Sequence, residues 1–221
     1  MRKKLARLLI IVTCAAFFLF LFRNKEKRQE EREAMNFMVQ EYIKKQEQTV
    51  SETAETKPAE LNTEVTATEE TQETKPEEKK PPVSLSYDGE IDSILNIPSI
   101  GLMQPVIRGN DEYNLEKKLL VCKGSLSGNY TVMGHNLYAG FVNFSSLHKL
   151  SIGDEVTLQS GETIMEYKVS EKYEALATDS EALFPQGEQN VLTLLTCTTW
   201  YRVKETKYLV IKCTKVGESI D

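Results

Sequence analysis

Histidine and cysteine are scarce in this chain of 221 residues, and their scarcity excludes several classes of protein. The chain has two His, four Cys and one Trp. No two Cys stand in a Cys-x-x-Cys pair, and two His are too few for the usual zinc clusters, so we expect no metal site and no cofactor. Four Cys in a chain this long also exclude a small scaffold built from disulfides.

Positive charge is in deficit as well, which argues against a nucleic-acid partner. The formal net charge is −6, whereas general nucleic-acid binders usually carry a basic face. Residues 51–80 hold nine Glu against four Lys, a local balance of −5, so one segment supplies most of the acidity. The remainder of the chain is close to neutral.

The N-terminus combines a basic end, residues 1–7, with an uncharged apolar run over residues 8–22. Fifteen helical residues span about 22 Å, and Leu5 and Ala6 with outward-reaching Arg7 and Arg23 extend this toward a hydrocarbon core of roughly 30 Å. Two interpretations remain open, an uncleaved signal anchor and a cleaved signal peptide. We favour the anchor because bulky residues follow the run where a cleavage site needs small ones.

The segment that follows the apolar run predicts a helical stalk over residues 23–48. It is dense in Glu, Lys, Arg and Gln, and Met35, Met38, Val39 and Tyr42 recur at helical spacing. The plain interpretation is a stalk that leaves the membrane. Self-association through this narrow apolar stripe is the alternative.

Residues 49–82 are rich in Thr, Glu, Lys and Pro and contain no aromatic residue. Such a segment buries too little apolar surface to offset its ordering entropy, so we expect a disordered linker. A flexible linker of this length reaches about 30–35 Å, enough to let a domain search the space beyond a membrane.

Residues 83–221 form the expected folded domain, in which short β-rich runs alternate with turn signals. Residues 155–159 and 163–169 flank Ser160-Gly161 and predict a hairpin, while 191–196 and 208–212 could be neighbouring strands. Short helices are expected only over 114–119 and 144–150. The pattern predicts a mostly β barrel or sandwich with one or two short helices.

Two residues at strand ends could carry thiol chemistry. Cys197 ends the run Leu192-Thr-Leu-Leu-Thr196, where a thiol can be partly exposed as a nucleophile requires. His135 follows the run that ends at Met133-Gly134 and could present its ring to the same edge. Each residue taken singly is also compatible with a structural role. The other histidine, His148, has no chemical group around it in the sequence and is expected at the surface.

The chain also offers two cations that could stabilise an oxyanion formed at Cys197. Arg202 is expected in the turn after Cys197, and Lys207 opens the following strand. Each of them is alternatively an ordinary solvated charge.

Together these segments resemble the sortase family. Thr193-Leu-Leu-Thr-Cys197 matches the T-L-x-T-C signature, and Val132-Met-Gly-His-Asn136 resembles the strand and Gly-His segment of that family. Residues 96–106 resemble its first two strands, and 144–154 resemble the segment after its histidine. The resemblance covers about residues 94–212, in the order found in the family.

The resemblance implies a closed β-barrel of seven to eight strands with Cys197 as nucleophile and His135 as acid and base. The family also uses an essential Arg near the start of the strand after the Cys. In that position this chain has Lys207, and Arg202 lies five residues earlier; we prefer Arg202 because only it supplies a guanidinium. Thr196 is expected to support substrate binding, and Leu183 and Phe184 to line an apolar groove for the sorting motif.

By resemblance, the protein is expected to be a cysteine transpeptidase of a Gram-positive surface, that is, a thiol-protease type of hydrolase that also transfers acyl groups. It would cleave an LPxTG-like sorting motif of secreted proteins through a Cys thioester and pass the acyl group to an amine, such as a peptidoglycan cross-bridge, in cell wall protein anchoring. The domain would stand outside the cell on a single-pass anchor.

Four alternatives to this expectation stay open. Three concern the function: a hydrolytic thiol peptidase on the same fold, a pilin-polymerising enzyme, or an inactive scaffold. The fourth concerns the structure: a disulfide between Cys122 and Cys213.

Overall fold

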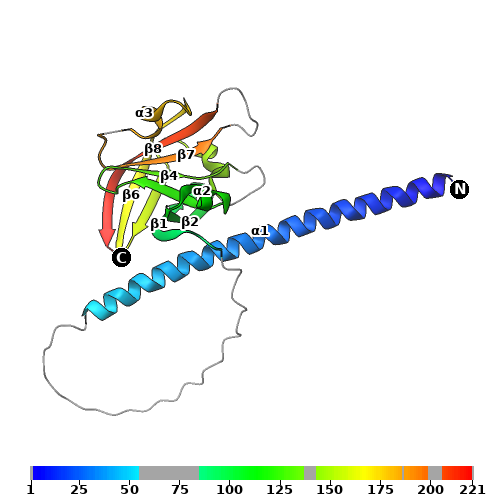
Figure 1. Cartoon of the computed structure of the whole chain (residues 1–221), viewed down its shortest axis with the longest axis horizontal. Helices are drawn as coiled ribbons and strands as arrows, with labels where there is room; N and C mark the ends of the chain where they lie inside the picture. The colour runs from blue at the N-terminus through cyan, green and yellow to red at the C-terminus, as the bar shows by residue number, and fades with distance from the viewer. Residues whose placement is uncertain (1, 55–84, 137–142, 186, 199–205, 221) are drawn as a thin grey trace, which may run out of the picture.

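The computed structural model describes residues 2–54, 85–136, 143–185, 187–198 and 206–220. A long N-terminal helix lies along a β-barrel, and the two are the main bodies of the molecule (Figure 1). The elements in chain order are α1 (Arg2–Ala54), β1 (Gly89–Ile97), η1 (Pro98–Ile100), β2 (Leu102–Gly109), α2 (Asp111–Glu116), β3 (Leu120–Gly124), β4 (Asn129–Met133), η2 (Asn143–Lys149), β5 (Glu155–Ser160), β6 (Thr163–Leu176), α3 (Ser180–Leu183), β7 (Val191–Cys197) and β8 (Lys207–Ile220).

The eight strands close into a barrel in the order β1-β2-β3-β4-β7-β8-β6-β5. The pairs β2/β3 and β4/β7 are parallel, and the other pairs are antiparallel. This confirms the mostly β fold and its closed barrel. Closure satisfies strand edges that an open sheet would leave unpaired.

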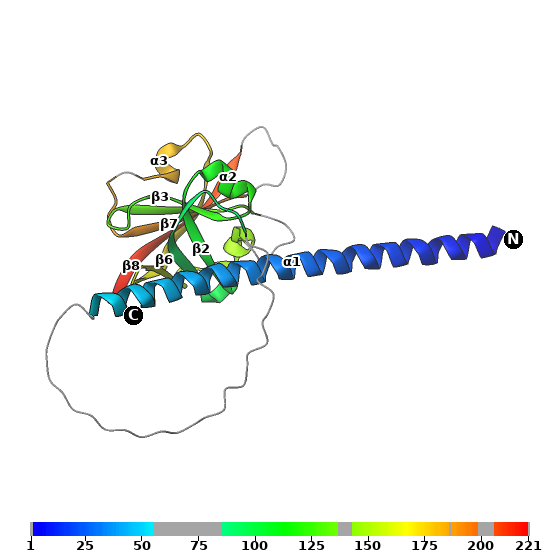
Figure 2. The same ribbon diagram turned by 60° about the horizontal axis from the view of Figure 1, so that its bottom comes forward.

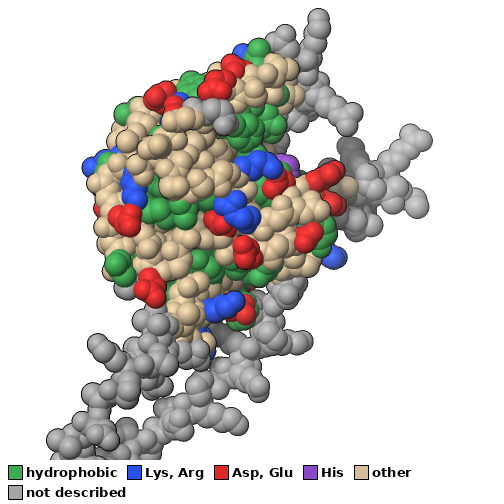
Figure 3. Space-filling model, turned by 60° about the vertical axis from the view of Figure 1, so that its left-hand side comes forward, with side chains coloured by type: hydrophobic (Ala, Val, Ile, Leu, Met, Phe, Trp, Pro, Cys, Tyr) green, Lys and Arg blue, Asp and Glu red, His purple; other side chains and the backbone are tan. Residues whose placement is uncertain are grey.

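Side chains that alternate along the strands fill the interior of the barrel. Leu192 and Leu194 on β7 pack there with Ile211 on β8, and the two largest buried side chains are Tyr130 and Tyr167. On the exterior, Lys and Arg are interspersed with Asp and Glu over the face that Figure 3 shows. The main core therefore lies inside the barrel, and smaller apolar clusters lie outside it.

The β5–β6 hairpin forms where the sequence predicts it. Ser160 pairs with Thr163, so Gly161 and Glu162 make a two-residue turn, and Gly161 has the left-handed φ of 61° that glycine tolerates best. The predicted neighbours 191–196 and 208–212 also pair, as the antiparallel strands β7 and β8.

The first short helix lies three residues earlier than the sequence suggested, over Asp111–Glu116 and not over 114–119. The Asn110 side chain accepts a hydrogen bond from the Tyr113 amide at 3.2 Å, which fixes the helix start. The helix stops before Lys118, whose φ of 63° is left-handed, and the fully buried Leu119 then leads into β3.

Helix α1 differs from the expected stalk in its length and in its contacts. It continues to Ala54, six residues into the expected linker, and residues 55–84 lie outside the described part of the chain. The predicted apolar stripe packs on the barrel of the same chain, since Met35 and Met38 contact Ile107, and Val39 contacts Ile94. The alternative that this stripe mediates self-association is therefore wrong in this structure, because the barrel already covers it.

Among the residues that the structure describes, no helix has a stretch long and apolar enough to cross a membrane. The expected anchor over residues 8–22 remains a prediction.

Candidate functional site

The site lies where the parallel strands β4 and β7 end side by side. Met133 is in register with Leu195, and the Gly134 amide continues the ladder by donating to the Leu195 carbonyl at 3.1 Å. Gly134 and Thr196 come next along the two strands, and His135 and Cys197 follow them, so the same register carries both residues to one edge of the barrel. The two residues are 62 positions apart in the sequence.

Alternation along β7 places Cys197 on the outer surface of the barrel. Leu194 faces the interior core, so Leu195 faces outward and so does Cys197 two residues later. Met133 packs with Leu195 on the outer surface, and His135 follows two residues later, just beyond the end of β4. We call this surface of β4, β7 and β8 the Cys197 face.

Thr196 points the other way and ties the two strand ends together. Its hydroxyl donates to the Gly134 carbonyl at 2.8 Å, and its side chain is buried. The Asn136 side-chain amide adds a second tie by donating to the Cys197 carbonyl at 2.9 Å. Both bonds fix the backbone next to His135 and Cys197. The role of Asn136 was missed in the sequence, where its only signal is its place beside His135.

Close packing at Gly134 also limits which residue can precede His135. A β-carbon there would stand 2.5 Å from Leu120 Cδ2 and 3.1 Å from Phe144 Cδ2. A larger residue there would have to displace the side chains of Leu120 and Phe144. The Phe144 amide donates to the His135 carbonyl at 3.1 Å, which anchors the chain after the histidine to η2.

The environment of Cys197 favours a neutral thiol in the unliganded protein. Burial raises the pKa of the Cys197 thiol above its ordinary value, and the Tyr208 hydroxyl opposes this by lowering it. Tyr208 stands directly across from Cys197 in the β7/β8 ladder, and burial raises its own pKa. The sequence did not single out Tyr208, because its place beside the thiol depends on the strand register.

An apolar cluster lies on the same face as Cys197. Ala175, Leu183, Leu195 and Val210 are buried in it, with Met133, Tyr173, Ala182, Phe184 and Tyr208 packed around them. The expected groove residues Leu183 and Phe184 thus lie in the same cluster as Tyr208. Phe184 also borders a cavity of about 390 Å³ that reaches Asn129 and Thr131.

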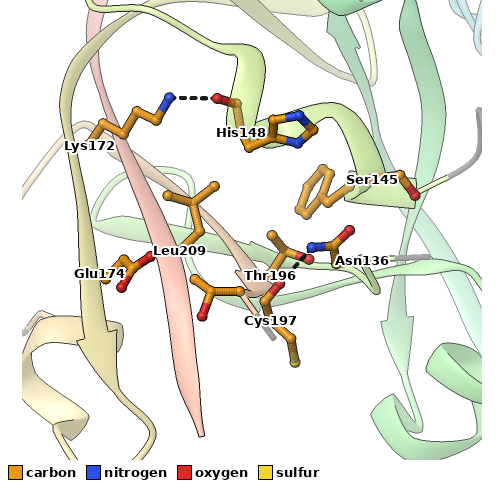
Figure 4. A pocket seen from close by; sticks show the side chains of 10 residues that line it. Asn136, Ser145, His148, Lys172, Glu174, Thr196, Cys197 and Leu209 are labelled. Atoms are coloured by element: carbon orange, nitrogen blue, oxygen red, sulfur yellow. Dashed lines mark hydrogen bonds between the residues drawn. The ribbon is translucent and has the colours of Figure 1, made fainter. Parts of the chain in front are cut away.

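A second cavity, of about 490 Å³, lies at the end of β7. Cys197 itself lines this cavity, together with Thr196, Leu209, Lys172 and His148. In Figure 4 the Cys197 sulfur points away from His148, which lies across the cavity. His148 is exposed, and its carbonyl accepts a bond from Lys172 Nζ at 2.6 Å.

The two candidate cations differ in what the structure describes. Arg202 lies outside the described residues. Lys207 begins β8 one residue before Tyr208, so its side chain leaves the strand on the face opposite to Cys197. There its Nζ lies 3.9 Å from Glu174 Oε2.

Cys122 and Cys213 are free thiols in the barrel interior. Both are buried and unpaired, and burial raises their thiol pKa values to about 11 and about 12. Within the described ranges, no group of three or more His, Cys, Asp or Glu side chains could hold a metal ion.

Comparison with known proteins identifies a family that this chain matches. A family model described as the Sortase domain matches residues 95–216, more than half of the chain. Sortase A of Bacillus anthracis is 32% identical over 106 residues, which are 47% of this chain and 50% of that protein. The chain therefore matches about half the length of that relative.

Two solved structures share the fold. Sortase A of Listeria monocytogenes has a TM-score of 0.53 at 21% identity and covers 59% of this chain and 90% of its own. Sortase C-3 of Streptococcus pneumoniae has a TM-score of 0.53 at 25% identity, and the match covers 61% of this chain and 66% of that chain. The residues that the family model matches, 95–216, run from β1 into β8.

Proposed function

This chain belongs to the sortase family of cysteine transpeptidases, and we propose that it cleaves a sorting motif through a Cys197 thioester and transfers the acyl group to an amine. One observation carries the proposal. The parallel pairing of β4 with β7 brings His135 and Cys197 to one edge, on the face that also bears the apolar cluster.

In the proposed reaction, the Cys197 thiolate attacks the scissile carbonyl of an LPxTG-like peptide. The C–N bond of the tetrahedral intermediate breaks as His135 gives its proton to the leaving amine, and a thioester remains. An incoming amine then loses a proton to His135, attacks the thioester and releases the thiolate. The amine belongs to a peptidoglycan cross-bridge or to another acceptor at the cell wall.

We propose Arg202 as the cation that stabilises the oxyanion. The strand face of Lys207 supports this choice, because its side chain leaves β8 on the face opposite to Cys197 and lies 3.9 Å from Glu174 Oε2. A guanidinium can donate to the oxyanion and to a substrate carbonyl together, which an ammonium on a flexible stem does less well. Leu183 and Phe184 are proposed to hold the apolar part of the sorting motif.

The catalytic assignments are tested with a fluorogenic sorting peptide. Cys197→Ala should abolish turnover, and His135→Ala should lower kcat by about 10²–10⁴-fold, the usual contribution of acid–base catalysis. His148→Ala is the matched control and should change little, since the Cys197 sulfur points away from it. Loss of activity in the His148 variant with retention in the His135 variant would refute the assignment.

Product analysis separates transpeptidation from hydrolysis. Incubation with a triglycine or other amine acceptor should give the ligated peptide in excess of the free acid. Formation of the free acid alone with every amine in a panel would favour the thiol-peptidase alternative. Ligation only to a pilin lysine would favour the pilin-polymerising alternative.

We further propose that residues 8–22 anchor the protein in the cell membrane with the barrel outside. The support is their uncharged sequence and the exposure of the described aromatic and aliphatic side chains over residues 17–22, which range from 46% to 72%. A free-standing surface rarely exposes so large an apolar patch. Intact-mass measurement of the membrane fraction tests this, because a cleaved signal peptide would yield a shorter soluble chain.

A further inference from the structure

One face of α1 is committed to the barrel over residues 31–46, which we call the docked segment. Ala34, Met35, Met38, Val39 and Tyr42 are buried to 8% exposure or less. These residues recur at intervals of three and four, so they share one face of the helix. The residues between them, such as Phe37 at 48%, stay exposed.

The barrel presents a matching apolar surface to this face. Met35 and Met38 contact Ile107 and Leu119, both of them fully buried. Farther along the helix, Val39 and Tyr42 contact Ile94 on β1. Strand residues that face away from the barrel core are buried here only because the helix covers them.

Two polar contacts fix the helix along its axis. Near the start of the docked segment, Glu31 Oε1 accepts from Lys118 Nζ at 2.6 Å. Near its other end, the Gly161 amide donates to the Tyr42 hydroxyl at 3.0 Å. Apolar contacts alone would allow the helix to slide, whereas these two bonds specify one position.

The docked segment lies on the opposite side of the barrel from the catalytic residues. It packs on β1, β2 and the β5–β6 turn, while β7 stands four strands away from β1 in either direction around the barrel. Figures 1 and 2 show α1 along one side of the barrel and α3 toward the other. The helix therefore leaves the Cys197 face uncovered.

On the N-terminal side, a short helical stretch separates the docked segment from the apolar residues. Residues 23–30 continue α1, and their side chains are exposed except for the half-buried Arg28. Eight residues at 1.5 Å each span about 12 Å. The chain of residues 55–84 joins the far end of α1 to the barrel, so it does not lie between the apolar run and the docked segment.

We propose that α1 is a rigid spacer that holds the barrel, and with it the Cys197 face, at one height and orientation above the membrane. This inference rests on the proposed anchor over residues 8–22. The site then works in a fixed layer near the membrane surface, and its substrate is a peptide bond presented within that layer. The acidic segment after α1 does not set the reach of the enzyme.

The test compares two insertions of equal length in the full chain, reconstituted in liposomes. Seven helix-forming residues inserted after Lys25 lengthen the spacer by about 10 Å and keep the helix face in phase to about 20°. The matched control inserts seven residues after Thr66. Each protein also carries Cys14→Ser, so that a maleimide dye reacts with the partly exposed Cys197 while Cys122 and Cys213 are buried.

Energy transfer from the dye on Cys197 to an acceptor lipid reports the height without any turnover. The insertion after Lys25 should lengthen the dye-to-membrane distance by about 10 Å, and the insertion after Thr66 should leave it unchanged. A distance that responds to the Thr66 insertion, or that ignores the Lys25 insertion, would overturn the proposal. Because no catalysis is needed, the result is independent of the proposed reaction.

Undocking the helix provides a second, independent arm. The double variant M38D/V39D places two charges in the apolar interface and should spread the transfer efficiency over a broad range of distances. F37D, on the exposed side of the same turn, should keep the single distance. An unchanged single distance in M38D/V39D would show that docking does not set the height.

If the proposed function holds, an activity assay with lipid-linked peptides tests the same spacing. A sorting peptide linked to a lipid through spacers of graded length should show an optimum spacer that shifts by about 10 Å with the Lys25 insertion. Turnover of the free peptide should not change. An optimum that stays in place while the measured height moves would overturn the fixed working layer but not the reaction.

Discussion

Replacing Thr196 by Val removes one hydrogen bond at the point where the two strand ends are joined. The Thr196 hydroxyl donates to the Gly134 carbonyl at 2.8 Å and is buried. Valine has nearly the same shape, so the substitution leaves the packing in place. The Gly134 carbonyl loses its donor in a region that water does not reach.

The expected cost follows from this unpaired acceptor. A buried polar group left without a partner costs about 1–3 kcal/mol of folding free energy. The bond lies one residue from both Cys197 and His135, so part of that energy holds the two side chains in their mutual position. If about 1.4 kcal/mol of it is expressed in the transition state, kcat/KM falls tenfold.

Thr193→Val is the matched control on the same strand. The Thr193 hydroxyl donates to Asn129 Oδ1 at 2.8 Å, and its side chain is also buried, but it lies four residues from Cys197. Urea unfolding and steady-state kinetics on the sorting peptide are measured for both variants. Both should lose stability, but only Thr196→Val should lose about tenfold or more in kcat/KM.

Two outcomes would refute this reasoning. One is a Thr196→Val enzyme that is destabilised yet fully active, since the bond would then serve folding alone. The other is an equal loss of kcat/KM in both variants, which would indicate a general loosening of β7.

Three further predictions address the thiol, the cation and the helix. Because burial raises the thiol pKa of Cys197, the rate of its alkylation by iodoacetamide should rise with pH and reach half its maximum at a pH above ~8.5, the ordinary pKa of a thiol. Tyr208→Phe should move that midpoint to a higher pH, because the Tyr208 hydroxyl lowers the thiol pKa. A midpoint below pH 8 would contradict the buried thiol. Arg202→Lys should lower kcat by about a hundredfold or more while Lys207→Ala changes it little, and the reverse result would assign the oxyanion to Lys207. The fragment 83–221 should keep the barrel, but its free energy of unfolding should be at least ~2 kcal/mol lower than that of the fragment 23–221, because it exposes the apolar surface under α1. Equal free energies of unfolding would show that the helix does not stabilise the barrel.

The third of these revises an expectation drawn from composition. Residues 23–48 look like a solvated stalk because most of their side chains are charged or amide, and a domain that begins at residue 83 then seems self-sufficient. The structure instead buries Met35, Met38, Val39 and Tyr42 against the barrel. The stripe itself was visible at helical spacing, but periodicity cannot say which surface covers it.

Local sequence determined the parts of this protein that depend on neighbours in the chain. The β5–β6 hairpin followed from Ser160-Gly161, since a two-residue turn needs only a residue that tolerates positive φ. The run Leu192–Thr196 predicted a strand that ends at Cys197, and the motif pointed to His135 as its partner. Resemblance was needed for that last step, because each residue alone fits a structural role.

Only the tertiary structure decided which side chains share a face. The parallel pairing of β4 with β7 joins segments about 60 residues apart, and a shift of one residue in the β7/β8 register would exchange Tyr208 for Lys207 opposite Cys197. Such registers result from the packing of the whole core. The same holds for α1, whose apolar stripe is written in the sequence but whose partner surface exists only once the barrel has closed.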